Sequence, residues 1–217
     1  MEFRVCVANL NVAAIGKDTH IIDCVLDQFG ITHKSLQSHK DITDENMVFC
    51  VNYYQLIPHN IIDKLTYGAW TFHGSDLPKG RGWAPLGWAL INCDSVFTLT
   101  LFKVDSGMDT GMYYKKASVP IIETDTIDSL RIKAFAMTTQ LAKSMILDAM
   151  ATNAVLLHEQ VGEPTYFSRR LPADSELDID KTLKELWPLI RACHNDNYPA
   201  FFKVNGRKII IKYEVEE

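Results

Sequence analysis

Short apolar runs alternate with helical patterns through the N-terminal half of the chain, and this alternation restricts the fold more than any other feature. Strand-like runs at residues 3–8, 47–51, 69–73 and 96–104 alternate with helical patterns at residues 21–29, 58–65 and 84–92. Helices that cover both faces of a parallel sheet leave its strands as near-continuous apolar runs. The sequence therefore predicts an α/β fold, a Rossmann-like, mostly parallel sheet with helices on both faces.

The pattern changes in the C-terminal half. Residues 111–119 alternate weakly and are expected to pair with the strand before them, and residues 126–150 predict one long helix with an apolar stripe: Ile127, Leu130, Ala134, Met137, Leu141 and Met145. A Gly-Glu-Pro break at residues 162–164 divides a main domain, residues 1–160, from a small appendage, residues 161–217. In the appendage, Asp180 is expected to cap a helix that must kink or split at Pro188, and Asn205-Gly206 predicts a β-hairpin.

Charge and cysteine content exclude several classes of protein. The chain carries 22 Lys and Arg against 27 Asp and Glu, a formal net charge of −5. A negative net charge is unfavourable for a protein that binds nucleic acid along a wide face, but it does not exclude one local basic pocket. Five widely spaced cysteines contain no C-x-x-C pair, so neither a zinc site nor a disulfide framework is indicated. The sequence shows no secretory signal and no run of ~20 apolar residues, so we expect a cytoplasmic protein without a membrane partner.

The clearest chemistry lies in a turn-rich loop after the third strand-like run. His73 ends that strand, where ligands bind in α/β sheets, and suits an acid, a base or an electrostatic stabiliser. For a histidine considered alone, a hydrogen bond to a turn carbonyl is the commoner explanation. In the same loop Lys79 and Arg81, framed by Gly80 and Gly82, indicate contact with an anionic group, and a solvated turn is the alternative.

A second loop, residues 104–111, follows the fourth strand-like run and contains two aspartates and two glycines. Because this loop also follows a strand, we expect it at the same edge of the sheet as His73. Glycines allow a tight turn that presents backbone amides, and a carboxylate close to His73 would favour the charged imidazole and orient its ring. A plain hairpin turn is the alternative, since a calcium loop needs more oxygen ligands than this segment offers.

Three ordered segments resemble the 10-formyltetrahydrofolate-dependent formyltransferase family. Residues 72–88 look like its signature loop, with His-x-Ser-x-Leu-Pro, then Arg-Gly, then Pro and a Trp-Ala helix. Residues 104–111 are similar to the Val-Asp-Ser-Gly-Met-Asp-Thr-Gly loop, and residues 52–58 to the segment before the signature loop. The resemblance is strong over residues 47–122 and moderate over residues 165–172 and 178–202; the three segments in order are a specific signal.

The C-terminal segments at residues 166–170, 189–192 and 198–201 resemble the branch that formylates amino groups on nucleotide-linked sugars. The resemblance therefore implies a catalytic domain at residues 1–160 that moves the formyl group of 10-formyltetrahydrofolate onto a nucleotide-linked amino sugar, an activity of polysaccharide biosynthesis. The chain also lacks room for the tRNA-gripping domain of methionyl-tRNA formyltransferases, and together with the charge of −5 this counts against a tRNA substrate.

The resemblance also implies catalytic residues. The family's catalytic histidine falls on His73 and its aspartate on Asp109, so that His73 would stabilise the oxyanion of acyl transfer and Asp109 would hold His73 and help relay the proton of the amine. The third member, an asparagine in the family, falls on Thr71, which offers one donor on a shorter arm. Loss of one oxyanion donor typically costs roughly 10²–10³ in rate, so Thr71 does the task poorly, a neighbour supplies the donor, or the enzyme is impaired. The loop at residues 9–16 also departs from the family.

Binding residues follow from the same resemblance. The pterin is expected against main-chain groups of two segments: Tyr54, Gln55, Leu56 and Ile57, and Asp105, Gly107, Met108 and Asp109. The substrate is expected at Ser75, Lys79, Gly80, Arg81, Gly82, Tyr166, Arg169 and Arg170. The last two arginines suit nucleotide phosphates, and an exposed basic pair is an equally good explanation of them. The reaction requires no metal.

Several alternatives stay open at this stage. A glycinamide ribonucleotide formyltransferase shares the central motifs and the cofactor, but the C-terminal resemblance weighs against it. A module that binds folate or a nucleotide sugar without catalysis is motivated by Thr71. A dinucleotide-binding domain is disfavoured because no G-x-G-x-x-G follows the first strand. The apolar hairpin end at residues 209–211 would be covered by the chain itself or by a second copy in a homodimer.

Overall fold

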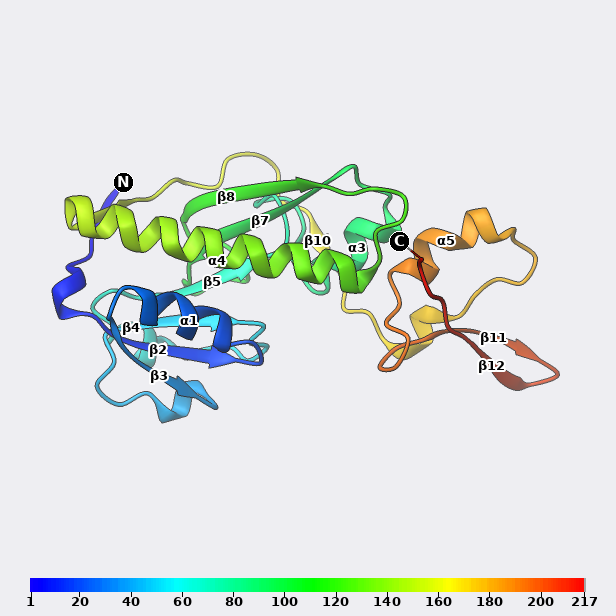
Figure 1. The fold of residues 1–217 in the computed structure, drawn as a ribbon, viewed down its shortest axis with the longest axis horizontal. Coiled ribbons are helices and arrows are strands. Elements are labelled where there is room, and N and C mark those ends of the chain that lie inside the picture. Colours follow the sequence, from blue (N-terminus) through cyan, green and yellow to red (C-terminus); the bar gives the residue numbers. More distant parts are fainter. Residues whose placement is uncertain (217) are drawn as a thin grey trace.

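The computed structural model describes residues 1–216 and has a six-stranded central sheet of strand order β3-β2-β4-β5-β7-β8 (Figure 1). The strands are β2 (Asn11–Gly16), β3 (Thr32–Leu36), β4 (Met47–Val51), β5 (Ala69–His73), β7 (Val96–Lys103) and β8 (Tyr113–Pro120). The first four strands in space pair in parallel, whereas β7 pairs antiparallel with both β5 and β8. The predicted fold class, an α/β protein with a mostly parallel sheet, is confirmed.

Helices α1 (His20–Gln28), α3 (Pro85–Ile91) and α4 (Ile127–Thr152) cover one face of this sheet and share its main core. Figure 1 shows α4 running lengthwise beside β7 and β8, with α1 next to it. The opposite face carries a smaller apolar cluster, against which Ile57 and Leu65 pack from the segment around the short helix α2 (His59–Ile62). Because no long helix covers that face, loops can reach the strands there.

The apolar stripe predicted for the long helix is buried at every position: Ile127, Leu130, Ala134, Met137, Leu141 and Met145. Thr126 begins the helix, and its side chain accepts a hydrogen bond from the Ser129 amide while the Ser129 side chain accepts one from the Thr126 amide. Such reciprocal capping satisfies two donors that a helix start leaves free. The stripe is therefore a core surface and binds no ligand.

The N-terminal prediction was wrong in its placement of the first strand. Residues 3–8 do not enter the central sheet; β1 (Glu2–Arg4) pairs antiparallel with β9 (Ala154–Leu156), and a 3₁₀ helix, η1 (Val7–Asn9), follows it. The first central strand is β2, which lies within residues 9–16, the segment predicted to be a loop that departs from the family. A central strand is covered on both faces, and residues 12–15 (Val-Ala-Ala-Ile) are completely buried. Residues 3–8 contain Arg4, which is exposed, so they do not suit such a position.

The C-terminal elements form their own small cluster, built from α5 (Leu183–Arg191), β11 (Ala200–Val204) and β12 (Arg207–Ile211). The predicted hairpin is confirmed, with both Asn205 and Gly206 at positive φ. One detail was wrong, because Thr182 rather than Asp180 caps α5. Of the two outcomes expected at Pro188, a kink or a split, the split does not occur: α5 continues through Pro188, and the carbonyl that loses its partner belongs to the exposed Lys184.

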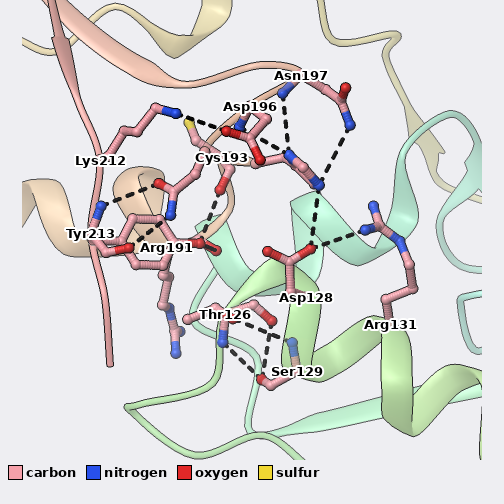
Figure 2. Close-up of polar contacts among 12 residues, drawn as sticks. Thr126, Asp128, Ser129, Arg131, Arg191, Cys193, Asp196, Asn197, Lys212 and Tyr213 are labelled. Atoms are coloured by element: carbon pink, nitrogen blue, oxygen red, sulfur yellow. Dashed lines mark hydrogen bonds and ion pairs between the residues drawn. The ribbon is translucent and has the colours of Figure 1, made fainter. Parts of the chain in front are cut away.

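Polar contacts join this C-terminal cluster to the rest of the chain. His194, between α5 and β11, places its Nε2 3.7 Å from Oδ1 of Asp128 on α4. Figure 2 shows Asp128 beside Arg131, which donates to it at 3.0 Å, and, within the cluster, the Tyr213 hydroxyl donating to the Cys193 carbonyl at 3.0 Å. The buried Arg191 donates to the carbonyl of Ile122 at 3.0 Å. In the hairpin itself Ile211 packs into the cluster, whereas Ile209 and Ile210 are exposed.

A short parallel pair links the appendage to the signature loop: β10 (Tyr166–Phe167) pairs with β6 (Arg81–Gly82). The Arg81 amide donates to the Thr165 carbonyl at 2.9 Å, and the Trp83 amide donates to the Phe167 carbonyl at 3.1 Å. Residues 165–167 are therefore held against the loop that contains His73. Within residues 1–216, no helix is long and apolar enough to cross a membrane.

Candidate active site

Strand β5 presents Thr71 and His73 on the face of the sheet that no long helix covers. Trp70 and Phe72 pack into the main core beneath α4, and side chains alternate along a strand, so Thr71 and His73 point the other way. Cys50, which pairs with Thr71 across the strands, lies in the smaller cluster on that face. Thr71 and His73, at the positions where the family has its catalytic asparagine and histidine, therefore share one face of the sheet.

The His73 imidazole is held at both nitrogens. Its Nε2 lies 2.7 Å from the carbonyl oxygen of Gly80, and its Nδ1 lies 3.6 Å from Oδ2 of Asp109; the side chain is 9% exposed. Because a carbonyl oxygen can only accept, Nε2 carries a proton in this contact. His73 therefore makes the hydrogen bond to a turn carbonyl that was the purely structural alternative, and it also has a carboxylate at its other nitrogen.

Asp109 reaches His73 by an unexpected route. Strand β7 is antiparallel to β5, so that Lys103 pairs with Trp70 and Thr100 pairs with His73. The prediction that the second loop begins at the same edge as His73 was therefore wrong. The loop starts at the opposite end of β5 and folds back over the open face, with Asp109 in the left-handed region at φ 54°. The Gly82 amide then donates to Asp109 Oδ2 at 2.8 Å.

Within this loop, Asp105 stabilises the turn itself. Its Oδ1 accepts a hydrogen bond from the Gly107 amide at 3.0 Å and another from the Thr110 hydroxyl at 2.6 Å. An aspartate that bonds to its own loop in this way fixes a turn. Asp105 Oδ1 is therefore occupied by bonds within the loop. A ligand that binds here would meet main-chain groups, beside the half-exposed Met108.

Residues 54–57 offer free main-chain groups. In the described part of the chain none of their amide or carbonyl groups takes part in a hydrogen bond, and Leu56 is 85% exposed. Backbone groups need partners, which here must be water or a ligand. A ring with donors and acceptors along its edge, such as the pterin that the resemblance predicts here, would supply such partners.

Two aromatic rings and two cations gather beside this segment. The Tyr54 ring stacks on Trp83 with centroids 6.4 Å apart and planes 11° apart. The Lys17 ammonium lies 5.5 Å from the centre of the Tyr54 ring, and the Arg169 guanidinium lies 5.0 Å from that of Trp83. Both distances fall in the range of cation–π attraction. Sequence reasoning missed Lys17 and Trp83, although Trp83 directly follows the Arg-Gly of the signature loop.

The structure separates the two arginines that were predicted to bind phosphates. Arg169 is exposed and lies over Trp83, whereas Arg170 is half-buried, approaches Gly87 of α3 and donates to the Asp174 carbonyl at 3.2 Å. A guanidinium that bonds to the protein is less available to a ligand. Arg169 is therefore the better placed of the two for an anionic substrate.

The remaining predicted substrate residues also differ in access. Ser75 and Gly80 are buried and Lys79 is exposed. Arg81 donates to the Tyr166 hydroxyl at 3.4 Å, so these two lie together, but its Nε and Nη2 donate to Oε1 of Gln160 at 3.2 and 2.7 Å. Sequence reasoning also missed Gln160, because nothing near residue 160 marks it as a partner of a loop far away in the sequence.

Thr71 and Cys50, on the same face of the sheet as His73, do not act as nucleophiles in this arrangement. The Thr71 hydroxyl donates to the Cys50 carbonyl at 3.2 Å, so its one proton is already used. Burial raises the pKa of the Cys50 thiol to about 12, which keeps it protonated and unreactive at neutral pH. Among the residues that the structure describes, no group of three or more His, Cys, Asp or Glu side chains is arranged to hold a metal ion.

Comparison with known proteins gives the family and the fold of this chain. A methionyl-tRNA formyltransferase of Thermodesulfovibrio yellowstonii is 29% identical over 167 residues, which are 77% of this chain and 54% of the relative, so the chain spans about half the length of that relative. A sugar N-formyltransferase from Shewanella has the same fold, with a TM-score of 0.74, 19% identity and coverage of 96% of this chain and 98% of the other.

A second solved structure, WlaRD, is a sugar 3N-formyl transferase studied with dTDP and 5-N-formyl-THF; it has a TM-score of 0.69 and 18% identity and covers 93% of this chain and 85% of its own. The family described as Formyl transferase matches residues 27–145, more than half of the sequence. This match includes both His73 and Asp109. The chain belongs to the formyl transferase family.

Proposed function

We propose that this chain transfers the formyl group of 10-formyltetrahydrofolate to the amino group of a nucleotide-linked amino sugar. The observation that carries the proposal is the approach of His73 and Asp109, 3.6 Å apart, from two separate loops. They meet on the open face of the sheet, and the segment of residues 54–57, whose main-chain groups suit a pterin, is linked to them: Tyr54 stacks on Trp83, and the neighbouring Gly82 donates to Asp109. An imidazole and a carboxylate in contact are the groups that proton transfer to and from an amine requires.

Each group has a defined task in this reaction. When bound, 10-formyltetrahydrofolate supplies an already activated formyl group. Since Nε2 of His73 is bonded to Gly80, Nδ1 is the ring nitrogen that can take up or give a proton. Asp109, held by the Gly82 amide, stabilises the charged imidazole and fixes its ring. The Thr71 hydroxyl donates to Cys50, and Nε2 of His73 donates to Gly80, so neither proton is free for negative charge on a reacting oxygen. Nδ1 of a protonated His73, whose 3.6 Å separation from Asp109 is longer than a hydrogen bond, is the donor that remains.

A compact anionic substrate suits the surroundings better than a nucleic acid does. Two cations, Lys17 and Arg169, flank the stacked rings of Tyr54 and Trp83, whereas the whole chain has a net charge of −5. Phosphate backbones require a wide basic face, but one nucleotide requires only a few cations and an aromatic surface. In this proposal residues 1–160 form the catalytic domain, and residues 161–217 form an appendage that brings Arg169 to the substrate.

The proposal is tested with 10-formyltetrahydrofolate and a panel of nucleotide-linked amino sugars that differ in nucleotide and amine position. Release of tetrahydrofolate and the mass of the formylated sugar are measured together. We expect turnover with at least one member of the panel and none with His73→Ala. Binding of such a sugar without turnover would instead support a non-catalytic module.

Methionyl-tRNA is the second candidate substrate, because the relative from Thermodesulfovibrio yellowstonii is a methionyl-tRNA formyltransferase. Charged methionyl-tRNA and glycinamide ribonucleotide are therefore assayed beside the sugar panel. Turnover confined to the tRNA would overturn the sugar proposal, and so would turnover confined to glycinamide ribonucleotide. The acidic charge of the chain argues against the tRNA, and the C-terminal resemblance to the sugar branch argues against glycinamide ribonucleotide, so we expect neither result.

A further inference from the structure

Gln160 bonds to both loops of the candidate site with every group of its side chain. Its Nε2 donates to the carbonyl oxygens of Asp109, at 2.9 Å, and Gly111, at 2.8 Å. Its Oε1 accepts from Nε and Nη2 of Arg81, at 3.2 and 2.7 Å. A primary amide has two N–H donors and two oxygen lone pairs, so all four are used. Carbonyls only accept and a guanidinium only donates, which fixes the direction of the amide.

These bonds close a ring around Asp109. On one side Gln160 holds the backbone of Asp109, which lies in the left-handed region at φ 54° and so needs support from outside the loop. On the other side Gln160 holds Arg81, whose neighbour Gly82 donates its amide to the Asp109 carboxylate at 2.8 Å. The backbone and the carboxylate of Asp109 are thus fixed from opposite directions through one side chain.

We propose that Gln160 is a positioning residue that sets the Asp109 carboxylate against Nδ1 of His73; this rests on the proposed function of that pair. Gln160 touches neither His73 nor the reacting atoms, so it acts through the loop. Only a residue with donors and an acceptor on one planar group can hold two carbonyls and a guanidinium together. A displacement of about 1 Å at a reacting group can cost roughly 10² in rate.

Two substitutions divide the contacts of Gln160. Gln160→Met has a similar shape and loses every hydrogen bond, whereas Gln160→Glu keeps an acceptor for Arg81 and loses the donors to Asp109 and Gly111. We expect both variants to lower kcat by roughly 10- to 100-fold, with KM for the sugar changed less than about threefold. Gln140→Glu, the same change on the exposed face of α4, is the control and should leave kcat unchanged. A normal kcat in Gln160→Glu would overturn the proposal.

A double-mutant cycle asks whether the effect passes through Asp109. In an Asp109→Asn background, Gln160→Met should cause little further loss of kcat, because the group that it positions is already disabled. A further loss as large as that in the wild-type background would show that Gln160 acts elsewhere and would overturn the proposal. Circular dichroism and thermal unfolding confirm that each variant is folded.

A spectroscopic measurement tests the same point without any substrate. The Gly82 amide donates to Asp109, so its proton chemical shift and hydrogen-exchange protection report the position of that carboxylate. Asp109→Ala defines the signal of the broken bond. In Gln160→Met the Gly82 signal should move toward that reference while Gly30, which follows the C-terminal end of α1, stays in place. An unmoved Gly82 signal would overturn the proposal, whereas absence of formyl transfer with a moved signal would overturn only the proposed function.

Discussion

The hydrogen bond between His73 Nε2 and the Gly80 carbonyl, 2.7 Å long, selects the ring nitrogen that faces Asp109. With Nε2 occupied, Nδ1 is left 3.6 Å from the carboxylate. The bond closes the loop that the strand β5 opens, so the turn that shapes the signature segment also orients the imidazole.

Replacement of the imidazole should abolish formyl transfer. His73→Ala removes the one group that can exchange a proton at this position, and loss of general acid–base catalysis typically costs roughly 10²–10⁴ in rate. Tetrahydrofolate release is the measurement, and the unfolding midpoint should stay close to that of the parent. Near-normal turnover in this variant would refute the assignment of His73.

Thr71→Asn should be tolerated and should equal or exceed the parent in kcat. The longer amide projects from the same face of β5 as His73 and adds donors that the Thr71 hydroxyl, bonded to the Cys50 carbonyl, does not provide. Thr71→Val is the matched comparison; it should keep kcat and lose about 1 kcal/mol of stability with the hydrogen bond. A large fall in the rate of Thr71→Asn would mean that the hydroxyl has a local role of its own.

Arg169 and Arg170 should respond differently to truncation. Arg169 is exposed over Trp83, so Arg169→Ala should raise KM for the nucleotide sugar by about tenfold, the effect of one lost charged contact. Arg170 bonds to the Asp174 carbonyl, so Arg170→Ala should mainly lower the melting temperature. Steady-state kinetics and thermal unfolding of both variants separate these effects. A KM effect confined to Arg170→Ala would reverse the assignment.

Gly82 should tolerate no side chain. A Cβ at Gly82 would lie 2.6 Å from the Phe167 carbonyl oxygen, and its φ of +102° disfavours any other residue. Gly82→Ala should therefore break the pairing of β6 with β10 and lower both activity and stability. Gly30→Ala is the control: it has a similarly positive φ of +63° but open space, and should cost only about 1 kcal/mol. Equal losses in the two variants would contradict the steric explanation.

Stability should fall at high pH through Tyr213. Burial raises the pKa of this phenol to about 12, above its ordinary value near 10, and its hydroxyl donates to the Cys193 carbonyl (Figure 2). Between these two values the unfolded chain loses the proton while the folded chain keeps it. The stabilisation is thus complete below about pH 10 and is lost as the pH rises toward 12. Urea unfolding at about pH 9 and 11.5 should show a smaller loss for Tyr213→Phe; parallel curves would contradict this origin.

The central part of the chain could be predicted because its patterns are local. The run that became β4 is apolar throughout, the run that became β5 is apolar at Ala69, Trp70 and Phe72, and the stripe of α4 repeats at helical spacing. Neighbours in the sequence therefore carry the information. The first strand was misplaced because residues 3–8 and β2 are both short and apolar. Only the sheet, which buries β2 on both faces, distinguishes them.

For the candidate site, the sequence by itself determined the residue types and the order of the two loops that contain His73 and Asp109. Tertiary structure decided that they meet, and by which path: β7 runs antiparallel to β5, so the Asp109 loop folds back from the far end of that strand. It also decided the role of Gln160, 51 residues away from Asp109. Strand direction and such distant hydrogen bonds depend on how the whole core packs, and no local pattern encodes them.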